Sequence, residues 1–252
     1  MRAVEWARRR WEMLAASFAR PYPVTIPMVT LMALVPFYLF IPGTLPGRPP
    51  FVPELALDRW LPVIPAWAIV YGTAYLFLIV LPVLVVRQTE HIRRTYLAYL
   101  SVWVAAYICF LLYPTVAPRP VDVFGEGFAV WGLRFLYSAD PPFNCFPSIH
   151  VAHSFVSALS CYRVHRRLGV AAAFCALLVA VSTLLSKQHY VLDVIAGVLL
   201  ASVAYVVFLR GCRRDQVPDV DKEVAPLMAF GAAGIVGLAT VCLWIAYRLN
   251  LS

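Results

Sequence analysis

Long apolar runs constrain this chain more than any other feature of its sequence. A transmembrane α-helix needs about 20 consecutive, mostly apolar residues, and runs of that length recur along the 252 residues. Only 13% of the residues are charged, whereas a soluble globular domain carries about 25%. The sequence therefore predicts an all-α fold, a polytopic membrane helical bundle, and excludes an ordinary soluble domain.

The apolar runs predict seven spanning helices and a division of the chain into three parts. The expected helices lie at roughly 24–41, 61–86, 96–113, 147–162, 168–186, 190–209 and 226–247, with a short interfacial helix at 130–137. Before the first run, arginines alternate with Trp6, Trp11 and other apolar residues, a pattern typical of a helix lying on an anionic membrane surface. We therefore expect a basic amphipathic segment (1–22), a six-helix membrane domain (23–211), and a polar linker with a seventh helix (212–252).

The basic residues predict the orientation of the bundle. The formal net charge of +8 could indicate a nucleic-acid partner, but the Lys and Arg residues lie in short loops between apolar runs. Fifteen of the 21 fall in one alternate set of segments, which the positive-inside rule places in the cytoplasm. We therefore expect no nucleic-acid partner and a polar site on the non-cytoplasmic face. A bacterial inner membrane, with that face toward the periplasm or exterior, is the expected location, although an endomembrane also fits.

His189 and Asp193 stand where the sixth run begins, within the polar segment 182–193. Residues four apart lie on one face of a helix, one turn apart. A carboxylate at the mouth of a membrane helix is costly without a partner and marks a functional site by default. By holding one imidazole nitrogen, the carboxylate leaves the other free as a base or nucleophile. The structural alternative is a buried His–Asp hydrogen bond that only ties two helices together.

Two further polar clusters lie on the same face. Arg119 follows the third run, and Ser148 and His150 open the fourth, where Pro147 suits the first turn of a helix. A helix N-terminus favours anions, and the planar guanidinium of arginine matches phosphate oxygens. Lys187 adds a point charge close to His189. This set favours phosphoryl transfer over acyl transfer, and without an Asp-rich motif no metal or other cofactor is implied.

The six cysteines show no metal-binding spacing, and most lie in apolar runs, where cysteine behaves as a small hydrophobic residue. Cys145 is the one near a candidate site. No basic residue adjacent in the sequence would lower its thiol pKa, so the sequence does not favour a chemical role for it.

Together the three clusters resemble the signature motifs of the type 2 phosphatidic acid phosphatase superfamily of membrane enzymes. That family has an Arg-Pro motif, a Pro-Ser-Gly-His motif, and a Ser-Arg pair followed after five residues by His and after three more by Asp. Here the corresponding segments are Arg119-Pro120, Pro147-Ser-Ile-His150, and Ser182-Thr183 with His189 and Asp193. Their order, spacing and placement relative to six helices match over roughly residues 24–209.

The resemblance implies a covalent mechanism. His189 would attack phosphorus to form a phosphohistidine, and Asp193 would orient the imidazole and balance its charge. His150 would protonate the leaving oxygen and then activate the incoming water or alcohol. Arg119, Lys187 and Ser148 would hold the phosphoryl oxygens.

The sequence departs from the family pattern at three positions. Leu112 stands where the first motif begins with Lys, Ile149 replaces the Gly of the second motif, and Thr183 replaces the Arg of the third. Two of the usual three cations are therefore missing, although Lys187 lies four residues after Thr183 and could substitute. Four nearby residues are candidates for supporting contacts or for plain packing: Thr183, Gln188, His153 and Tyr113.

The motif details lead to three functional hypotheses. The first is a metal-independent lipid phosphatase or phosphotransferase that acts on a lipid phosphate and has membrane lipids around it. The second is a phospholipid headgroup transferase, because the motif style resembles inositol phosphorylceramide synthases and, more distantly, sphingomyelin synthases. A phosphodiester carries less negative charge than a phosphomonoester, which is consistent with the missing cations. The third is a non-catalytic lipid transporter. The sequence does not indicate the oligomeric state.

Overall fold

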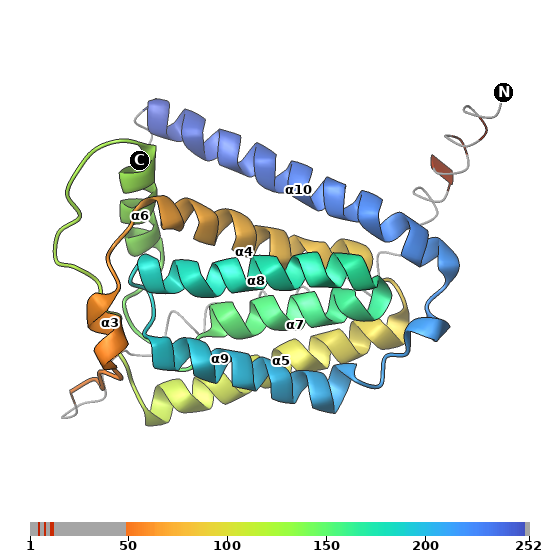
Figure 1. The fold of residues 1–252 in the computed structure, drawn as a ribbon, viewed down its shortest axis with the longest axis horizontal. Coiled ribbons are helices and arrows are strands. Elements are labelled where there is room, and N and C mark those ends of the chain that lie inside the picture. The colour runs from red at the N-terminus through yellow and green to blue at the C-terminus, as the bar shows by residue number, and fades with distance from the viewer. Residues whose placement is uncertain (1–4, 6–7, 9–10, 13–48, 250–252) are drawn as a thin grey trace.

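The structure, a computed structural model, describes residues 5, 8, 11–12 and 49–249 (Figure 1). The expected first spanning run at 24–41 and nearly all of the amphipathic segment 1–22 lie outside these residues. Within them the regular structure is helical, apart from the isolated bridges Phe51–Thr115 and Val116–Phe143. The all-α prediction is therefore confirmed.

Seven of the described helices build the bundle, when the π-helical end of α9 is counted separately. They are α4 (Ala66–Val85), α5 (Thr89–Leu112), α7 (Ile149–Val164), α8 (Arg166–Leu185), α9 (Val191–Ala204), its π-helical extension η1 (Tyr205–Leu209) and α10 (Asp219–Arg248). Shorter helices are α3 (Ala56–Trp60), α6 (Phe128–Ala139) and the 3-10 turn η2 (Arg214–Gln216). The short helix expected at 130–137 is α6.

Five of these helices are long and apolar enough to cross a membrane, namely α4, α5, α8, α9 with η1, and α10. This confirms an integral membrane protein. Two boundaries differ from expectation. The polar linker is shorter than expected, because α10 begins at Asp219 rather than near Pro226 and contains that proline. The fourth expected run, 147–162, is α7, which has the expected length of 16 residues but begins and ends two residues later, and it is not among the five long helices.

Helix α7 lies at the centre of the bundle, between α4 and α8 on one side and α5 and α9 on the other (Figure 1). Its residues enter both apolar clusters of the core. Ala158 and Cys161 pack into a cluster shared with α4, α8 and α10. Ala152 and Val156 pack into a second cluster with α5 and α9. Because α7 is covered on both sides, its side chains can include many polar groups without exposing them to lipid.

Polar side chains join α7 to α5 along their length. The Tyr99 hydroxyl lies 2.7 Å from the Ser157 hydroxyl, and Thr95 Oγ1 lies 2.7 Å from Ser160 Oγ. His91 Nε2 lies 3.2 Å from the same Ser160 oxygen. Hydrogen bonds between helices are a main source of association inside a bilayer, where apolar surface gains little by leaving lipid. We name this row of side chains the α5–α7 polar seam.

The connection between α7 and α8 is unusually tight. His165 caps both helices, since its backbone N–H donates to Cys161 and its Nδ1 accepts from the Leu168 N–H. In the first turn of α8, a Cβ on Gly169 would lie 2.2 Å from Tyr162 Cα. Only glycine allows the two helices to approach this closely so near their connection.

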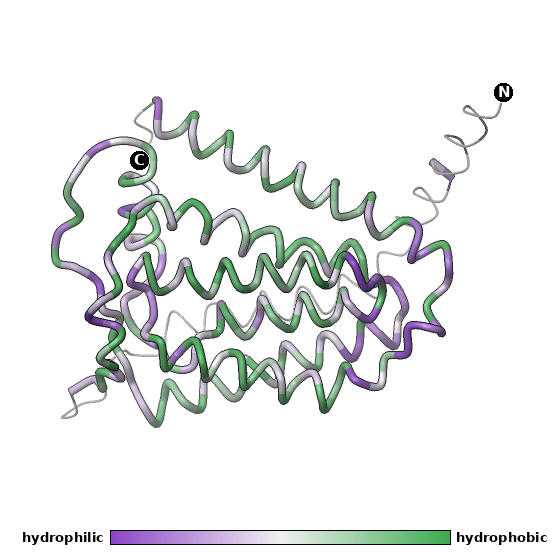
Figure 2. The backbone as a smooth tube through the Cα atoms, in the orientation of Figure 1, coloured by the Kyte–Doolittle hydropathy of each residue, from purple (hydrophilic) through white to green (hydrophobic). Residues whose placement is uncertain are grey.

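The hydrophilic segments lie at the two ends of the bundle, and the parts of the helices between these ends are mostly apolar (Figure 2). The basic connections around residues 87–94, 163–167 and 210–214 all lie at the end where α4, α7 and α9 finish. The opposite end holds α3, α6 and the starts of α7 and α9. The three candidate polar clusters belong to this second end.

Replacement of Gly169 by Ala is expected to destabilise the purified protein in detergent by about 1–3 kcal/mol, because the new methyl group would overlap the Tyr162 main chain. Thermal unfolding measures the effect. Gly237→Ala in α10 is the matched control, since nothing lies within 4 Å of a Cβ there and Ala favours a helix over Gly. Equal melting temperatures for the two variants would contradict the expected steric constraint.

Candidate functional site

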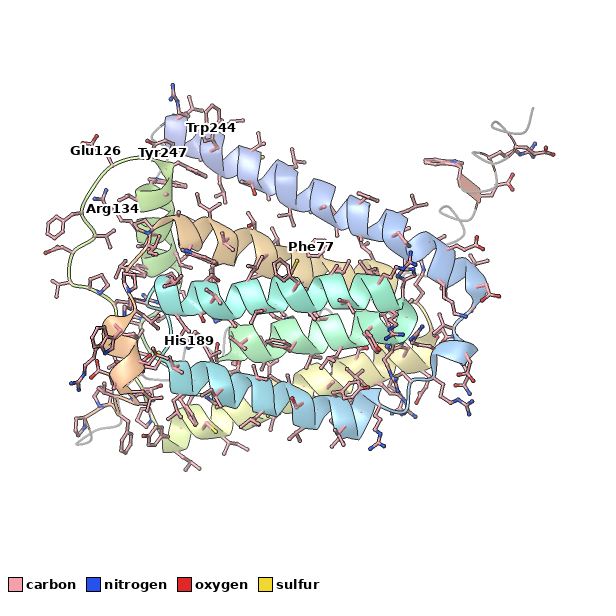
Figure 3. All side chains as sticks on the ribbon, viewed as in Figure 1. Phe77, Glu126, Arg134, His189, Trp244 and Tyr247 are labelled. Atoms are coloured by element: carbon pink, nitrogen blue, oxygen red, sulfur yellow. The ribbon has the colours of Figure 1, made fainter. Side chains whose placement is uncertain are left out.

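His189 and Asp193 meet at the start of α9, as their spacing predicts. His189 Nδ1 lies 3.3 Å from Asp193 Oδ2, and the Tyr190 backbone N–H donates to the same oxygen at 2.9 Å. The helix itself begins only at Val191, so His189 belongs to the connection before it rather than to a continuous helix. The Asp193 carboxylate is fully buried. Two donors therefore fix its Oδ2 and, through it, the orientation of the His189 ring (Figure 3 shows His189 at this end of the bundle).

His150 faces the other side of the His189 ring. It stands in the first turn of α7, and its Nδ1 lies 3.4 Å from His189 Nε2. The edges of two α4 side chains, Tyr71 and Tyr75, hold the His150 ring at centroid distances of 5.3 and 4.9 Å. Asp193, His189 and His150 thus form a row of a carboxylate and two imidazoles, which we call the His–Asp row.

The beginnings of α7 and α9 are fastened together beside this row. Ser148 is the N-cap of α7: its Oγ accepts from the Val151 N–H at 3.3 Å. Its own backbone N–H donates to the main-chain oxygen of Asp193 at 3.1 Å. A Cβ on Gly197 would lie 2.7 Å from the Ser148 carbonyl oxygen. Pro147 precedes the cap and does not occupy the first helical turn, in contrast to our expectation.

Arg119 is held by groups from two other segments. Its Nη1 donates to the carbonyl oxygens of Tyr137 and Asp140, at 3.1 and 2.8 Å, and its guanidinium lies 4.7 Å from the centre of the Tyr137 ring. Its Nε and Nη2 donate to Gln188 Oε1. Gln188 is the residue before His189, so this contact brings the guanidinium to the edge of the His–Asp row.

The amide of Gln188 has a free donor. Its Oε1 accepts from Arg119, while its buried Nε2 has no hydrogen-bond partner. Amide groups can be assigned in two orientations, but only an oxygen can accept from the guanidinium, so the nitrogen is the unpartnered atom. A buried N–H group without a partner is costly and calls for an explanation.

The other cation and the threonine of this segment point elsewhere. Lys187 has a positive φ of 54°, and its Nζ donates to the Asp58 carbonyl oxygen at 2.9 Å. The Thr183 hydroxyl donates to the Ala180 carbonyl at 2.8 Å, while the Thr183 carbonyl accepts from the N–H groups of Gln188 and His189. Thr183 therefore shapes the connection that carries His189, through its main chain.

His153 and Tyr113 flank the site without entering the His–Asp row. His153 stacks on Tyr99 with ring centroids 4.2 Å apart, and its Nδ1 is buried without a partner. It joins the α5–α7 polar seam to the site end of α7. Tyr113 stacks on Phe51 at 4.0 Å and packs edge-on against Phe146. These contacts place Tyr113 in the aromatic wall beside the start of α7.

Thr115 is a site neighbour that our sequence reasoning did not select, and Cys145 is one that it placed near a candidate site without assigning it a chemical role. The Thr115 hydroxyl accepts from the backbone N–H groups of Cys145 and Phe146, at 2.8 and 3.0 Å, and so fixes the segment before α7. The Cys145 Sγ lies within 4.8 Å of ligand atoms of both His189 and Asp193. Burial raises the pKa of the Cys145 thiol, which argues against a thiolate nucleophile. The order of residues around Cys145 gives no signal of either contact.

The structure therefore brings Arg119, Ser148, His150, His189, Asp193 and Gln188 together from three separate segments of the chain. A nucleophile or base, a second imidazole, an oriented carboxylate and one arginine gather around a helix N-terminus. Such a set can attack an electrophile, move a proton to or from it, and stabilise negative charge on its oxygens.

Comparisons with known proteins identify the family. The PAP2 superfamily matches residues 45–207, which is more than half of the chain. A curated PA-phosphatase related-family protein from Dictyostelium discoideum is 32% identical over 110 residues. That alignment covers 38% of this chain but only 20% of the Dictyostelium protein. No solved structure matches the chain. On the evidence of the match over 45–207, the chain belongs to the PAP2 superfamily.

Proposed function

We propose that this protein is a membrane lipid phosphatase or phosphotransferase that works through a phosphohistidine at His189. One observation carries the proposal: the His–Asp row, in which Asp193 holds one nitrogen of His189 and His150 faces the other. This row lies at one end of a membrane-spanning bundle, where the phosphate group of a lipid would lie. Membership of the PAP2 superfamily supports the same reaction class.

In the first step, His189 Nε2 is the attacking atom. When Nδ1–H donates to Asp193, the lone pair of the neutral ring is on Nε2. A bond forms between Nε2 and phosphorus as the bond from phosphorus to the alkoxide oxygen breaks. The ring becomes positively charged, and the ionised Asp193 carboxylate stabilises that charge. The same carboxylate also holds the ring in the orientation that the attack requires.

His150 supplies and receives the protons. In its protonated form it gives a proton to the leaving alkoxide, and the neutral ring then accepts a proton from the incoming water or alcohol. The oxygen of that second molecule attacks phosphorus and displaces His189. The 3.4 Å between the two imidazole nitrogens is too short to contain a phosphoryl group. The two imidazole rings therefore move apart as substrate enters.

Arg119 and the start of α7 stabilise the phosphoryl oxygens in this proposal. The guanidinium exchanges Gln188 Oε1 for a phosphoryl oxygen, while the unpartnered Gln188 Nε2–H donates to another. Ser148 and the free N–H groups of the first turn of α7 complete the set. Lys187 joins them only by leaving the Asp58 carbonyl, to which it donates in this structure.

Headgroup transfer from a phosphodiester lipid is a second candidate, and the shortage of cations favours it. Leu112 is 71% exposed on the surface of α5 and supplies no charge to the site. Thr183 donates within its own helix, and Lys187 donates to α3. Arg119 is then the remaining cation held beside the His–Asp row among the described residues. A phosphodiester has one negative charge to balance, whereas a phosphomonoester has up to two.

Replacement of His189 or His150 by Ala is expected to abolish turnover in mixed micelles. Loss of the acid–base group at His150 should cost about 100- to 10,000-fold. His165→Asn is the matched control, because that histidine caps α8 at the opposite end and Asn keeps an N-cap acceptor. Each protein is assayed in two reaction mixtures. One mixture contains phosphatidic acid, and the other contains a labelled phosphodiester lipid with a lipid alcohol.

The products decide between the hypotheses. Free phosphate from the monoester identifies a phosphatase, whereas a new phospholipid with little free phosphate identifies a headgroup transferase. Mass spectrometry of the quenched reaction should find the phosphoryl or phospho-headgroup adduct on His189. Undiminished turnover by folded His189→Ala protein would refute the mechanism. Translocation of lipid with neither product would instead favour the non-catalytic transporter.

We also propose that the site faces the non-cytoplasmic side, because the basic connections lie at the opposite end of the bundle. A water-soluble, short-chain lipid phosphate added to right-side-out vesicles should be turned over without detergent. Inverted vesicles should turn it over only after detergent opens them. The reverse result would place the site in the cytoplasm.

Gly197→Ala is expected to lower kcat by about 100-fold while the protein remains folded. The added Cβ would push α9 away from the Ser148 carbonyl and shift Asp193 and His189 relative to His150. Displacement of reacting groups by about 1 Å can have an effect of this size. Gly231→Ala in α10 is the control, since a Cβ there meets nothing within 4 Å. Unchanged kcat in a folded Gly197→Ala variant would show that the close approach is not required.

A further inference from the structure

Cys145 forms a cluster of three potential metal ligands with two members of the His–Asp row. The Cys145 sulfur, a nitrogen of His189 and a carboxylate oxygen of Asp193 lie within 4.8 Å of one another. All three residues are buried, with exposed fractions of 2%, 6% and 0%. Cys145 comes from the segment before α7, and the other two come from the start of α9, so the packing of the two helices creates the cluster.

A second observation concerns the Asp193 carboxylate. Asp193 Oδ2 accepts from His189 and from the Tyr190 N–H, but Asp193 Oδ1 is buried without any hydrogen-bond partner. A carboxylate in the interior of a membrane protein is costly unless its charge is balanced. A buried polar atom without a partner calls for an explanation, of which an ion is one.

We propose that Cys145, His189 and Asp193 form an inhibitory site for a divalent cation of the zinc type. Thiolate, imidazole and carboxylate are the ligands that Zn²⁺ takes in proteins, and a sulfur ligand disfavours Mg²⁺ and Ca²⁺. Three protein ligands leave a fourth tetrahedral position for water or a phosphate oxygen. Binding displaces the thiol proton of Cys145 to solvent and forms a bond from sulfur to the metal.

The ligand atoms are close enough for this site after small side-chain rotations. Bonds of about 2.3 Å to sulfur and about 2.0–2.2 Å to nitrogen and oxygen put tetrahedral ligands roughly 3.3–3.7 Å apart. The three ligand atoms lie up to 4.8 Å apart in the structure, so they have to approach one another by about 1 Å. The Cys145 Sγ makes a long contact of 3.9 Å with the Pro142 carbonyl, which its rotation would give up.

Inhibition follows from the roles of His189 and Asp193 in the proposed reaction, so this inference rests on the proposed function. A metal bound to either nitrogen of His189 withdraws electron density from the ring that must attack phosphorus. Its charge also neutralises the Asp193 carboxylate, which otherwise stabilises the imidazolium. The cation therefore competes with the chemistry and does not assist it. Cys145 has no part in the proposed reaction, so a variant can separate inhibition from turnover.

Metal binding can be tested without any substrate. The purified full chain in detergent is titrated with Co²⁺, whose thiolate complexes absorb in the near ultraviolet and visible range, and Zn²⁺ is added to displace it. Cys145→Ser should lose the thiolate band, whereas Cys242→Ser, which changes an exposed cysteine in α10, should keep it. Thermal unfolding checks that both variants are folded. A band that survives in Cys145→Ser, or the absence of any band in the unsubstituted protein, would overturn the site.

Inhibition is then measured on whichever substrate the protein turns over. Zn²⁺ should inhibit reversibly, with recovery on adding a chelator. Cys145→Ser should keep its basal turnover but require at least about 10-fold more Zn²⁺ for half-inhibition, as expected when a metal site is weakened. Equal inhibition of both proteins would refute the inhibitory role of this site. Failure of the proposed function would leave no turnover to inhibit, while the Co²⁺ spectrum would still decide whether the metal site exists.

Discussion

The close contact between the first turns of α7 and α9 is the constraint on which the rest of the site depends. The Ser148 N–H donates to the Asp193 carbonyl, and the absence of a side chain at Gly197 lets the helices meet there. This contact brings His150 from one helix against His189, which precedes the other. Neither helix presents both imidazoles alone, because His150 belongs to α7 and His189 precedes α9. Helix packing therefore sets the geometry of the chemistry directly.

Buried polar groups in the bundle differ in how completely they are hydrogen-bonded. Along the α5–α7 polar seam, Tyr99 and Thr95 are paired with serines of α7, so these buried hydroxyls stabilise the helix pair. Among the described residues, Trp103 Nε1 of α5 and Ser154 Oγ of α7 have no partner, and the same holds for His153 Nδ1, Gln188 Nε2 and Asp193 Oδ1 at the site end. Unsatisfied groups cost stability where they are buried. Gln188 Nε2 and Asp193 Oδ1 belong to the segment that carries His189, where they are available to a ligand.

Much of this arrangement could be predicted from the sequence, because its strongest signals are local. Apolar run length gave the spanning helices, and the spacing of His189 and Asp193 gave their contact. The connection of Arg119 to Gln188, and the turn of Lys187 toward Asp58, could not be predicted in this way. Lys187 was expected to face the site on a continued helix, but α8 ends at Leu185 and the chain reverses with a positive φ at Lys187. Tertiary contacts, not helical periodicity, decide where such side chains point.

The way Arg119 is held links the charge of the site to a wider part of the fold. Its guanidinium rests on the carbonyl groups of Tyr137 and Asp140 at the end of α6, and the Tyr137 hydroxyl donates to the Ser186 carbonyl. A helix C-terminus with unsatisfied carbonyls attracts a cation, so α6 holds the arginine in place before substrate arrives. The Arg119 guanidinium is therefore already oriented without substrate, and in the proposed reaction only its contact with Gln188 has to be exchanged. A site with one such preorganised cation is better matched to a substrate of low charge than to a dianion. The absence of the family cations at Leu112 and Thr183 thus bears on the choice of substrate through electrostatics rather than through shape.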